Sequence, residues 1–141
     1  MTYFFGEYQQ VIDSKNRIFI PAKFREILGE KAYIARNVDG CLSIYTEEGW
    51  RAYCDKILSL PSAEGSALAR FIFPATLDAK IDSQGRIVLT QQMKEYAGLE
   101  KEICIIGVGD HAEIWDKARR QAYINNEKTE ELIALMLRKQ F

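Results

Sequence analysis

Two short motifs place an aspartate four residues ahead of an arginine, with a turn-forming residue between them. They are residues 13–17, with the sequence DSKNR, and residues 82–86, with the sequence DSQGR. An aspartate side chain is suited to capping the backbone N–H groups of a turn. The arginine is suited either to pairing with that aspartate or to binding an anion such as a phosphate group. The motifs therefore predict two braced turns and leave both roles of the arginines open.

Four residues of these motifs are expected to shape the turns. Asn and Gly tolerate a positive φ best, and they occupy the equivalent position of the two motifs. A turn cap explains the position of both aspartates fully, which favours a structural role for them. The predicted turn-structural residues are Asp13, Asn16, Asp82 and Gly85.

Basic residues are concentrated in each turn and in the residues that follow it. Residues 14–25 contain four of them and no acidic residue, and residues 83–94 contain two and again no acidic residue. Lys and Arg neutralise DNA phosphates, and Arg also pairs with guanine through O6 and N7. This placement counts for more than the formal net charge of −1, which averages over the whole surface. This placement makes six residues candidates for DNA binding: Lys15, Arg17, Lys23, Arg25, Arg86 and Lys94.

Enzymatic chemistry has little support in the sequence. Pseudo-symmetry would bring Asp13 and Asp82 together as a carboxylate pair, but no second proton-transfer group recurs beside them. The chain has a single histidine, His111, and three cysteines without a C-x-x-C pair, which does not fit a zinc site. We therefore expect no enzyme, no catalytic residue, no metal and no cofactor. A ring-forming interaction protein without DNA function is the alternative.

The two motifs belong to an internal repeat. Residues 12–20 recur as residues 81–89 with five of nine positions identical, at an offset of 69 residues. Two copies are too few for a solenoid, which needs three or more to bury a continuous core. The repeat predicts instead a pseudo-dimer within one chain, in which each half completes the hydrophobic core of the other.

Each copy predicts a strand, a tight turn, a second strand, a short helix and a further hairpin. Amphipathic helices follow each copy, with Thr46 and Asp116 as candidate N-caps. Their apolar stripes exceed what 141 residues can bury, so the sequence predicts a homo-oligomer. No apolar run approaches the about 20 residues that a membrane span needs, and no membrane association is expected. In the first copy the strands are expected over residues 9–12, 17–20, 33–37 and 42–45.

Longer stretches of the sequence resemble the MraZ family of bacterial transcriptional regulators. Besides the two D-x-x-x-R motifs, the resemblance rests on residues 20–25 (IPAKFR), 95–102 (EYAGLEKE) and 113–116 (EIWD). It extends over most of the chain, from Gly6 to about Tyr123. Two positions depart from the family pattern. Asn16 stands where glycine is usual, and Thr90 stands where proline is common, which makes Thr90 a candidate N-cap.

The resemblance implies an α+β fold with a mostly β core. Two AbrB-like swapped-hairpin repeats would form one pseudo-symmetric, double-psi-like barrel with helices attached. The expected domains are residues 7–49 and 76–119 as DNA-binding repeats 1 and 2, residues 50–75 as a helical connector, and residues 120–141 as a helical tail.

The resemblance also implies a function. Family members form ring-shaped homo-oligomers that bind double-stranded DNA at short direct repeats upstream of the division and cell-wall gene cluster, and they repress transcription there. A cytoplasmic, nucleoid-associated repressor is therefore expected. The resemblance favours DNA contact for both motif arginines, and more so for Arg17 than for Arg86 because its neighbours are more basic.

Overall fold

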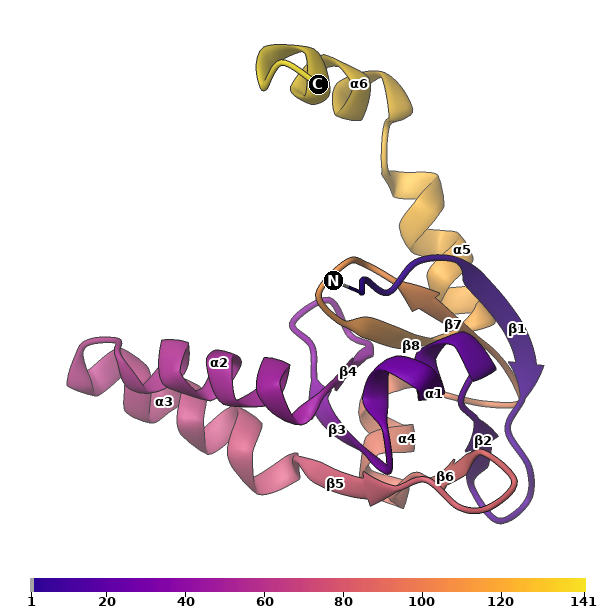
Figure 1. The fold of residues 1–141 in the computed structure, drawn as a ribbon. Coiled ribbons are helices and arrows are strands. Elements are labelled where there is room, and N and C mark those ends of the chain that lie inside the picture. The colour runs from indigo at the N-terminus through magenta and orange to yellow at the C-terminus, as the bar shows by residue number, and fades with distance from the viewer. Residues whose placement is uncertain (1) are drawn as a thin grey trace.

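A computed structural model describes residues 2–141, which contain eight strands arranged as a six-stranded sheet and a separate two-stranded ribbon (Figure 1). The sheet has the order β1-β7-β8-β4-β3-β5, and the ribbon consists of β2 and β6. Every pairing between neighbouring strands is antiparallel. The strands are β1 (Glu7–Val11), β2 (Arg17–Phe19), β3 (Lys31–Arg36), β4 (Leu42–Tyr45), β5 (Leu77–Lys80), β6 (Arg86–Val88), β7 (Glu102–Gly107) and β8 (Ala112–Asp116).

Helices α2, α4 and α5 each begin at a capping side chain. Thr46 Oγ1 accepts a hydrogen bond from the Gly49 N–H, Thr90 caps α4 in the same way, and Asp116 caps α5, so all three predicted N-caps are confirmed. Pro21 precedes α1, where its missing N–H costs nothing. The helices are α1 (Ala22–Leu28), α2 (Glu47–Leu58), α3 (Ser62–Ile72), α4 (Gln91–Ala97), α5 (Lys117–Asn126) and α6 (Thr129–Arg138), with a 3₁₀ turn, η1 (Phe73–Ala75), after α3.

The two repeats exchange strands. β1 of the first repeat pairs with β7 of the second, and β5 of the second pairs with β3 of the first. The ribbon takes one strand from each repeat. Consequently the strands on either side of each D-x-x-x-R turn do not pair with each other, although the predicted order of strand, turn and strand is correct. Periodicity predicts strands but not their partners, and here the partners lie in the other half of the chain.

The predicted α+β class and the two-repeat AbrB-like arrangement are confirmed. Within residues 2–141 the hydrogen-bonded ladder stays open between the edge strands β1 and β5, so the strands form no continuously bonded barrel. The ribbon is linked to the edge strand β1 by a side chain instead. The Gln10 amide donates to the Phe19 carbonyl at 2.6 Å and accepts from the Phe19 N–H at 2.8 Å.

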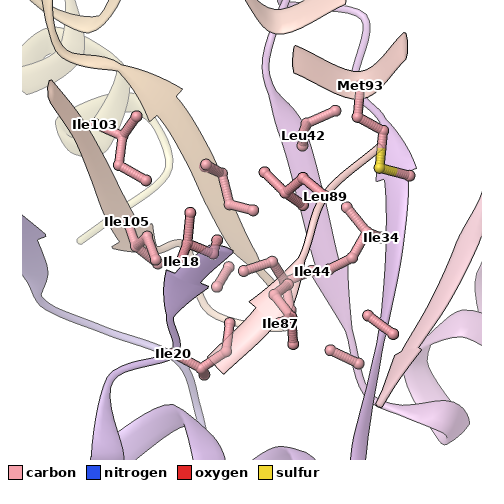
Figure 2. Close-up of a cluster of buried hydrophobic side chains, with 14 of the residues drawn as sticks. Ile18, Ile20, Ile34, Leu42, Ile44, Ile87, Leu89, Met93, Ile103 and Ile105 are labelled. Atoms are coloured by element: carbon pink, nitrogen blue, oxygen red, sulfur yellow. The ribbon is translucent and has the colours of Figure 1, made fainter. Parts of the chain in front are cut away.

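The main hydrophobic core lies between the sheet and the ribbon. Figure 2 shows Ile18 and Ile87 of the ribbon among side chains from β3, β4 and β7, with Met93 of α4 at one side. Ile18 is 0% and Ile87 1% exposed, and the two residues are directly opposed in the ribbon. Both repeats contribute to this main core, as the internal repeat predicts.

Helix α1 contributes Phe24 and Leu28 to this core, whereas α2, α3, α5 and α6 lie outside it. α2 and α3 run side by side and extend away from the sheet, while α5 and α6 lead away in another direction (Figure 1). Trp50 of α2 packs against Tyr33 and Tyr45, which anchors the helical pair on β3 and β4. Across residues 2–141, no helix has the length and apolar character that crossing a membrane requires.

Candidate nucleic-acid interface

Each D-x-x-x-R motif folds into a turn that its aspartate holds closed. One carboxylate oxygen of Asp13, Oδ1, accepts from the backbone N–H groups of Lys15 and Arg17, both at 2.9 Å. Asp82 Oδ1 accepts from the backbone N–H groups of Gln84 and Arg86 at the same distances. The hydrogen bond from the arginine N–H is the largest influence on each carboxyl group and lowers the pKa of both aspartates. Both side chains are therefore held as carboxylates.

The second carboxylate oxygen fixes the arginine of the same motif. Arg17 Nε donates to Asp13 Oδ2 at 2.6 Å, and Arg86 Nε donates to Asp82 Oδ2 at 3.0 Å. In the hydrogen bonds of residues 2–141, Nε is the only guanidinium atom that these two arginines use. A guanidinium has five N–H donors, so each Nη group keeps its donors for a ligand. The ion pair and an anion-binding role are thus compatible: the aspartate orients the arginine and leaves its outer edge free.

Both arginines project from the same face of the ribbon. Successive side chains of a strand point to opposite faces, and Ile18 and Ile87 occupy the buried face. The outer face therefore carries Arg17 and Phe19 of β2 with Arg86 and Val88 of β6. The register places Arg17 opposite Val88, and Phe19 opposite Arg86.

A cation from the short helix of each repeat lies on the turn of the other repeat. Lys94 of α4 donates from Nζ to Asn16 Oδ1 at 3.1 Å. Arg25 of α1, the equivalent residue at the offset of 69, packs its guanidinium against Gly85. Backbone hydrogen bonds cross in the same way, from Leu89 N–H to the carbonyl of Asn16 and from Ile20 N–H to that of Gly85, both at 2.8 Å. The exchange of strands thus brings the basic windows of the two repeats together.

Five of the six predicted DNA-binding residues gather at the ribbon and its turns. Lys15 is exposed in the first turn, Arg17 and Arg86 lie on the ribbon, and Arg25 and Lys94 lie on the turns. Lys23 is placed apart from them. Its Nζ lies 3.9 Å from the centre of the Phe5 ring, in the segment that precedes β1. It therefore flanks the cluster instead of contributing to it.

The two turns use different residues for a physical reason. Asn16 has φ 59° and Gly85 has φ 81°, a region in which most residues are strained. A Cβ atom at Gly85 would overlap with the Arg25 guanidinium, so a side chain at this position requires the guanidinium to move. The slimmer Lys94 leaves room for the Asn16 amide and hydrogen-bonds to it.

A second cluster of polar groups lies at the β7–β8 hairpin, and apart from the lone histidine no sequence pattern indicates it. His111 contacts Asp110 Oδ1 through Nδ1 at 2.7 Å and Glu113 Oε2 through Nε2 at 3.1 Å. Burial acts to lower the pKa of His111, but the two carboxylates prevail and raise it. Tyr45 stacks on the imidazole ring. The cluster joins β8 to β4 and lies away from the ribbon strands.

The three cysteines are free thiols with raised pKa values, of which Cys41 and Cys104 are buried and Cys54 is half-buried. Burial is the main cause at all three positions, and it raises the pKa of Cys104 to about 11. A raised pKa disfavours the thiolate, which is the nucleophilic form. Among residues 2–141 no group of three or more His, Cys, Asp or Glu side chains is arranged to hold a metal ion.

Two features of the ribbon are not predicted by the sequence analysis. One is that Phe19 and Val88 are exposed apolar residues, each opposite an arginine of the other strand. The alternation with buried Ile18 and Ile87 does indicate that these two side chains point outward. The other is the bridging role of Gln10, which has no such signal because it depends on the packing of β1 beside β2.

Comparison with known proteins identifies relatives along most of the chain. The family profile described as "MraZ protein, putative antitoxin-like" matches twice, at residues 3–70 and 72–139. A protein named transcriptional regulator MraZ from Acetivibrio thermocellus is 44% identical over 126 residues, which are 88% of each chain. Proteins of the same name are 43% identical over 85% of each chain in Moorella thermoacetica, and 42% identical over 93% of this chain and 94% of the relative in Clostridium botulinum (strain Eklund 17B / Type B).

Proposed function

This chain belongs to the MraZ family, and on that premise we propose that it is a transcriptional regulator that binds double-stranded DNA in a sequence-specific manner. The relatives from three organisms bear the name transcriptional regulator. The observation that carries the proposal is the convergence of five cations at the ribbon and its turns, with each repeat supplying a cation to the turn of the other. A two-stranded ribbon of this kind fits the major groove of DNA.

In this proposal some of the basic residues contact DNA bases and the others contact phosphates. Arg17 and Arg86 present their Nη donors at opposite corners of the outer face of the ribbon, where bidentate pairing with guanine is possible. Lys15, Arg25 and Lys94 contact phosphates on either side, and Lys23 reaches a more distant phosphate. Asp13, Asn16, Asp82 and Gly85 shape the turns. Residues 7–49 and 76–119 act as the two DNA-binding repeats, with residues 50–75 connecting them.

The active form in this proposal is a ring of several copies. α6 supports it, because the helix projects from the body of the chain (Figure 1) and exposes one large apolar side chain after another. Apolar surface of this extent is typical of a helix that packs on a partner. A heterologous contact between copies that closes on itself generates a ring. The exposed apolar residues of α6 are Leu132, Ile133, Leu135, Met136 and Leu137.

A ring favours a target made of direct repeats. Copies related by rotation present their ribbons in the same sense, so successive half-sites have the same orientation. Each ribbon makes few phosphate contacts, and several ribbons on one duplex increase the affinity through effective concentration. We place the target upstream of the division and cell-wall gene cluster that includes this chain's own gene. Binding there represses transcription, which locates the protein at the nucleoid.

The geometry of the aspartates supports a binding role over a catalytic one. General acid–base catalysis at neutral pH favours a carboxyl group whose pKa is raised toward 7. Asp13 and Asp82 have lowered pKa values and are each bound to an arginine of their own turn.

A DNA-binding titration tests the proposal. The probe is a duplex taken from immediately upstream of the gene, and the same duplex shortened to one repeat is the comparison. We expect binding that weakens steeply with salt, because each neutralised phosphate contributes a slope of about −0.9 in log K against log salt concentration. The longer duplex should bind more tightly. Equal binding of the two duplexes would contradict the ring on direct repeats, and no salt-sensitive binding would favour an interaction protein without DNA function.

A further inference from the structure

The outer face of the ribbon carries two exposed apolar side chains between its two arginines. Phe19 is 52% and Val88 58% exposed, and they occupy equivalent positions of the two repeats at the offset of 69. Each is directly opposite an arginine of the other strand. Diagonal neighbours across an antiparallel pair lie about 7–8 Å apart. Phe19 and Val88 are such a diagonal pair, so they form one apolar patch with an arginine at each of the other two corners.

This patch is held rigidly. The two hydrogen bonds with the Gln10 amide fix the backbone of Phe19 on one side, and the ladder with β6 fixes it on the other. Ile20 N–H, next along the chain, donates to the Gly85 carbonyl. A side chain on such a backbone presents its apolar surface without loss of backbone entropy on binding.

The charged residues near the patch indicate which kind of molecule binds there. Arg17 and Arg86 border the patch, and Arg25 and Lys94 lie on the adjoining turns. The two turn aspartates are each already bound to an arginine. A polyanion therefore fits this face better than a neutral protein surface does. The major groove of DNA offers an apolar group beside its phosphates, the C5 methyl of thymine, and apolar side chains including Phe contact it.

We propose that Phe19 and Val88 read thymine by contacting its C5 methyl group in the major groove, while Arg17 and Arg86 contact guanine or phosphate beside them. The inference rests on the proposed DNA-binding function and adds a source of base selectivity to it. Phe19 is larger than Val88, so the two halves of each ribbon contact thymine unequally. Phe19 makes the larger contribution to the affinity for thymine.

Replacement of thymine by deoxyuridine in the upstream duplex tests this directly, since the two bases differ only in the methyl group. A buried methyl contributes roughly 0.8 kcal/mol, so wild-type affinity should fall about fourfold for each contacted thymine. The Phe19→Ala variant should bind the thymine duplex more weakly than wild type and should lose most of the difference between the two duplexes. Val88→Ala should lose a smaller part of it. Val38→Ala removes an apolar side chain that is 81% exposed outside the ribbon, and it should retain the full difference.

The outcomes separate this inference from the proposed function. If wild type binds both duplexes equally and in a salt-sensitive manner, the thymine contact is wrong while DNA binding stands. If Phe19→Ala remains as sensitive to deoxyuridine as wild type, the sensitivity comes from DNA shape, which also contradicts the contact. If Phe19→Ala changes only the mass of the assembly, the patch is an interface between copies and the inference fails. Absence of binding to any duplex would contradict the proposed function itself.

Discussion

Lys94 Nζ lies 3.1 Å from Asn16 Oδ1, although the two residues are 78 positions apart in the chain. The contact has a counterpart in the other half, where Arg25 packs on Gly85. Each turn therefore depends on a cation from the other repeat. Both repeats therefore contribute to each half of the proposed DNA-binding surface, and neither repeat presents the whole of it.

The contact between Arg25 and Gly85 predicts the effect of Gly85→Ala. A Cβ at φ 81° is strained by about 1–2 kcal/mol, and it also displaces the Arg25 guanidinium. We expect a loss of that size in urea unfolding together with weaker DNA binding. Gly29→Ala is the control, because Gly29 also has φ 81° but no atom lies within 4 Å of its missing Cβ. It should be destabilised without a specific loss of DNA affinity, and an equal loss of affinity in both variants would argue against a role for Arg25.

Truncation of the ribbon isoleucines should destabilise both repeats to a similar extent. Ile18 and Ile87 are buried and oppose each other in one core. Ile→Ala in such a position costs about 2–5 kcal/mol, which urea unfolding measures. Val38→Ala, on an exposed loop, should change the free energy of unfolding by less than about 0.5 kcal/mol. Two separate unfolding transitions in either isoleucine variant would contradict the shared core.

The cluster around His111 predicts a dependence of stability on pH. The folded protein raises the pKa of His111 above its usual value of about 6.5, because Glu113 and Asp110 face the imidazole. The stabilisation is fully present below the unfolded pKa, and it is lost as the pH rises through the folded pKa. The free energy of unfolding should therefore decline from pH 6 toward pH 8. His111→Gln should flatten this decline, and an unchanged slope would show that other groups cause it.

The apolar face of α6 predicts how assembly depends on the tail. Leu132 and Met136 lie four residues apart on this helix and are both exposed. Replacing both with aspartate should lower the mass found by light scattering, while circular dichroism retains the signal of the folded chain. Wild type should be larger than a dimer. A monomer mass for wild type at micromolar concentration would contradict the proposed ring.

The sequence predicts the elements of this fold well and their partners poorly. Turn chemistry and periodicity locate the D-x-x-x-R turns, the caps at Thr46, Thr90 and Asp116, and the hairpins of both repeats. These signals are local. The pairing of β1 with β7 and of β2 with β6 depends on packing across the chain, so it follows only from the family resemblance.

The candidate DNA-binding site is likewise only partly predictable from the sequence. Charge placement identifies the basic windows of both repeats, because Lys and Arg are visible in the sequence wherever they fold. It does not separate Lys23 from the other five cations, since its position over Phe5 depends on the path of the segment before β1. It also does not reveal that Arg25 and Lys94 cross to the opposite turn.

Salt-titrated binding of Arg17→Ala to the upstream duplex tests the central claim most directly. Arg17 is partly exposed, and its surface pair with Asp13 contributes only about 0–1 kcal/mol, so the variant should fold and assemble normally. Each lost contact should cost roughly 1–3 kcal/mol of binding, multiplied over the engaged copies, and specific binding should disappear. The Arg86→Ala variant should lose less DNA-binding affinity. The control is Arg51→Ala, which breaks the exposed ion pair with Glu47 on α2 and should bind DNA as wild type does. A folded Arg17→Ala protein with wild-type affinity would contradict the account and leave the ion pair as the role of this residue.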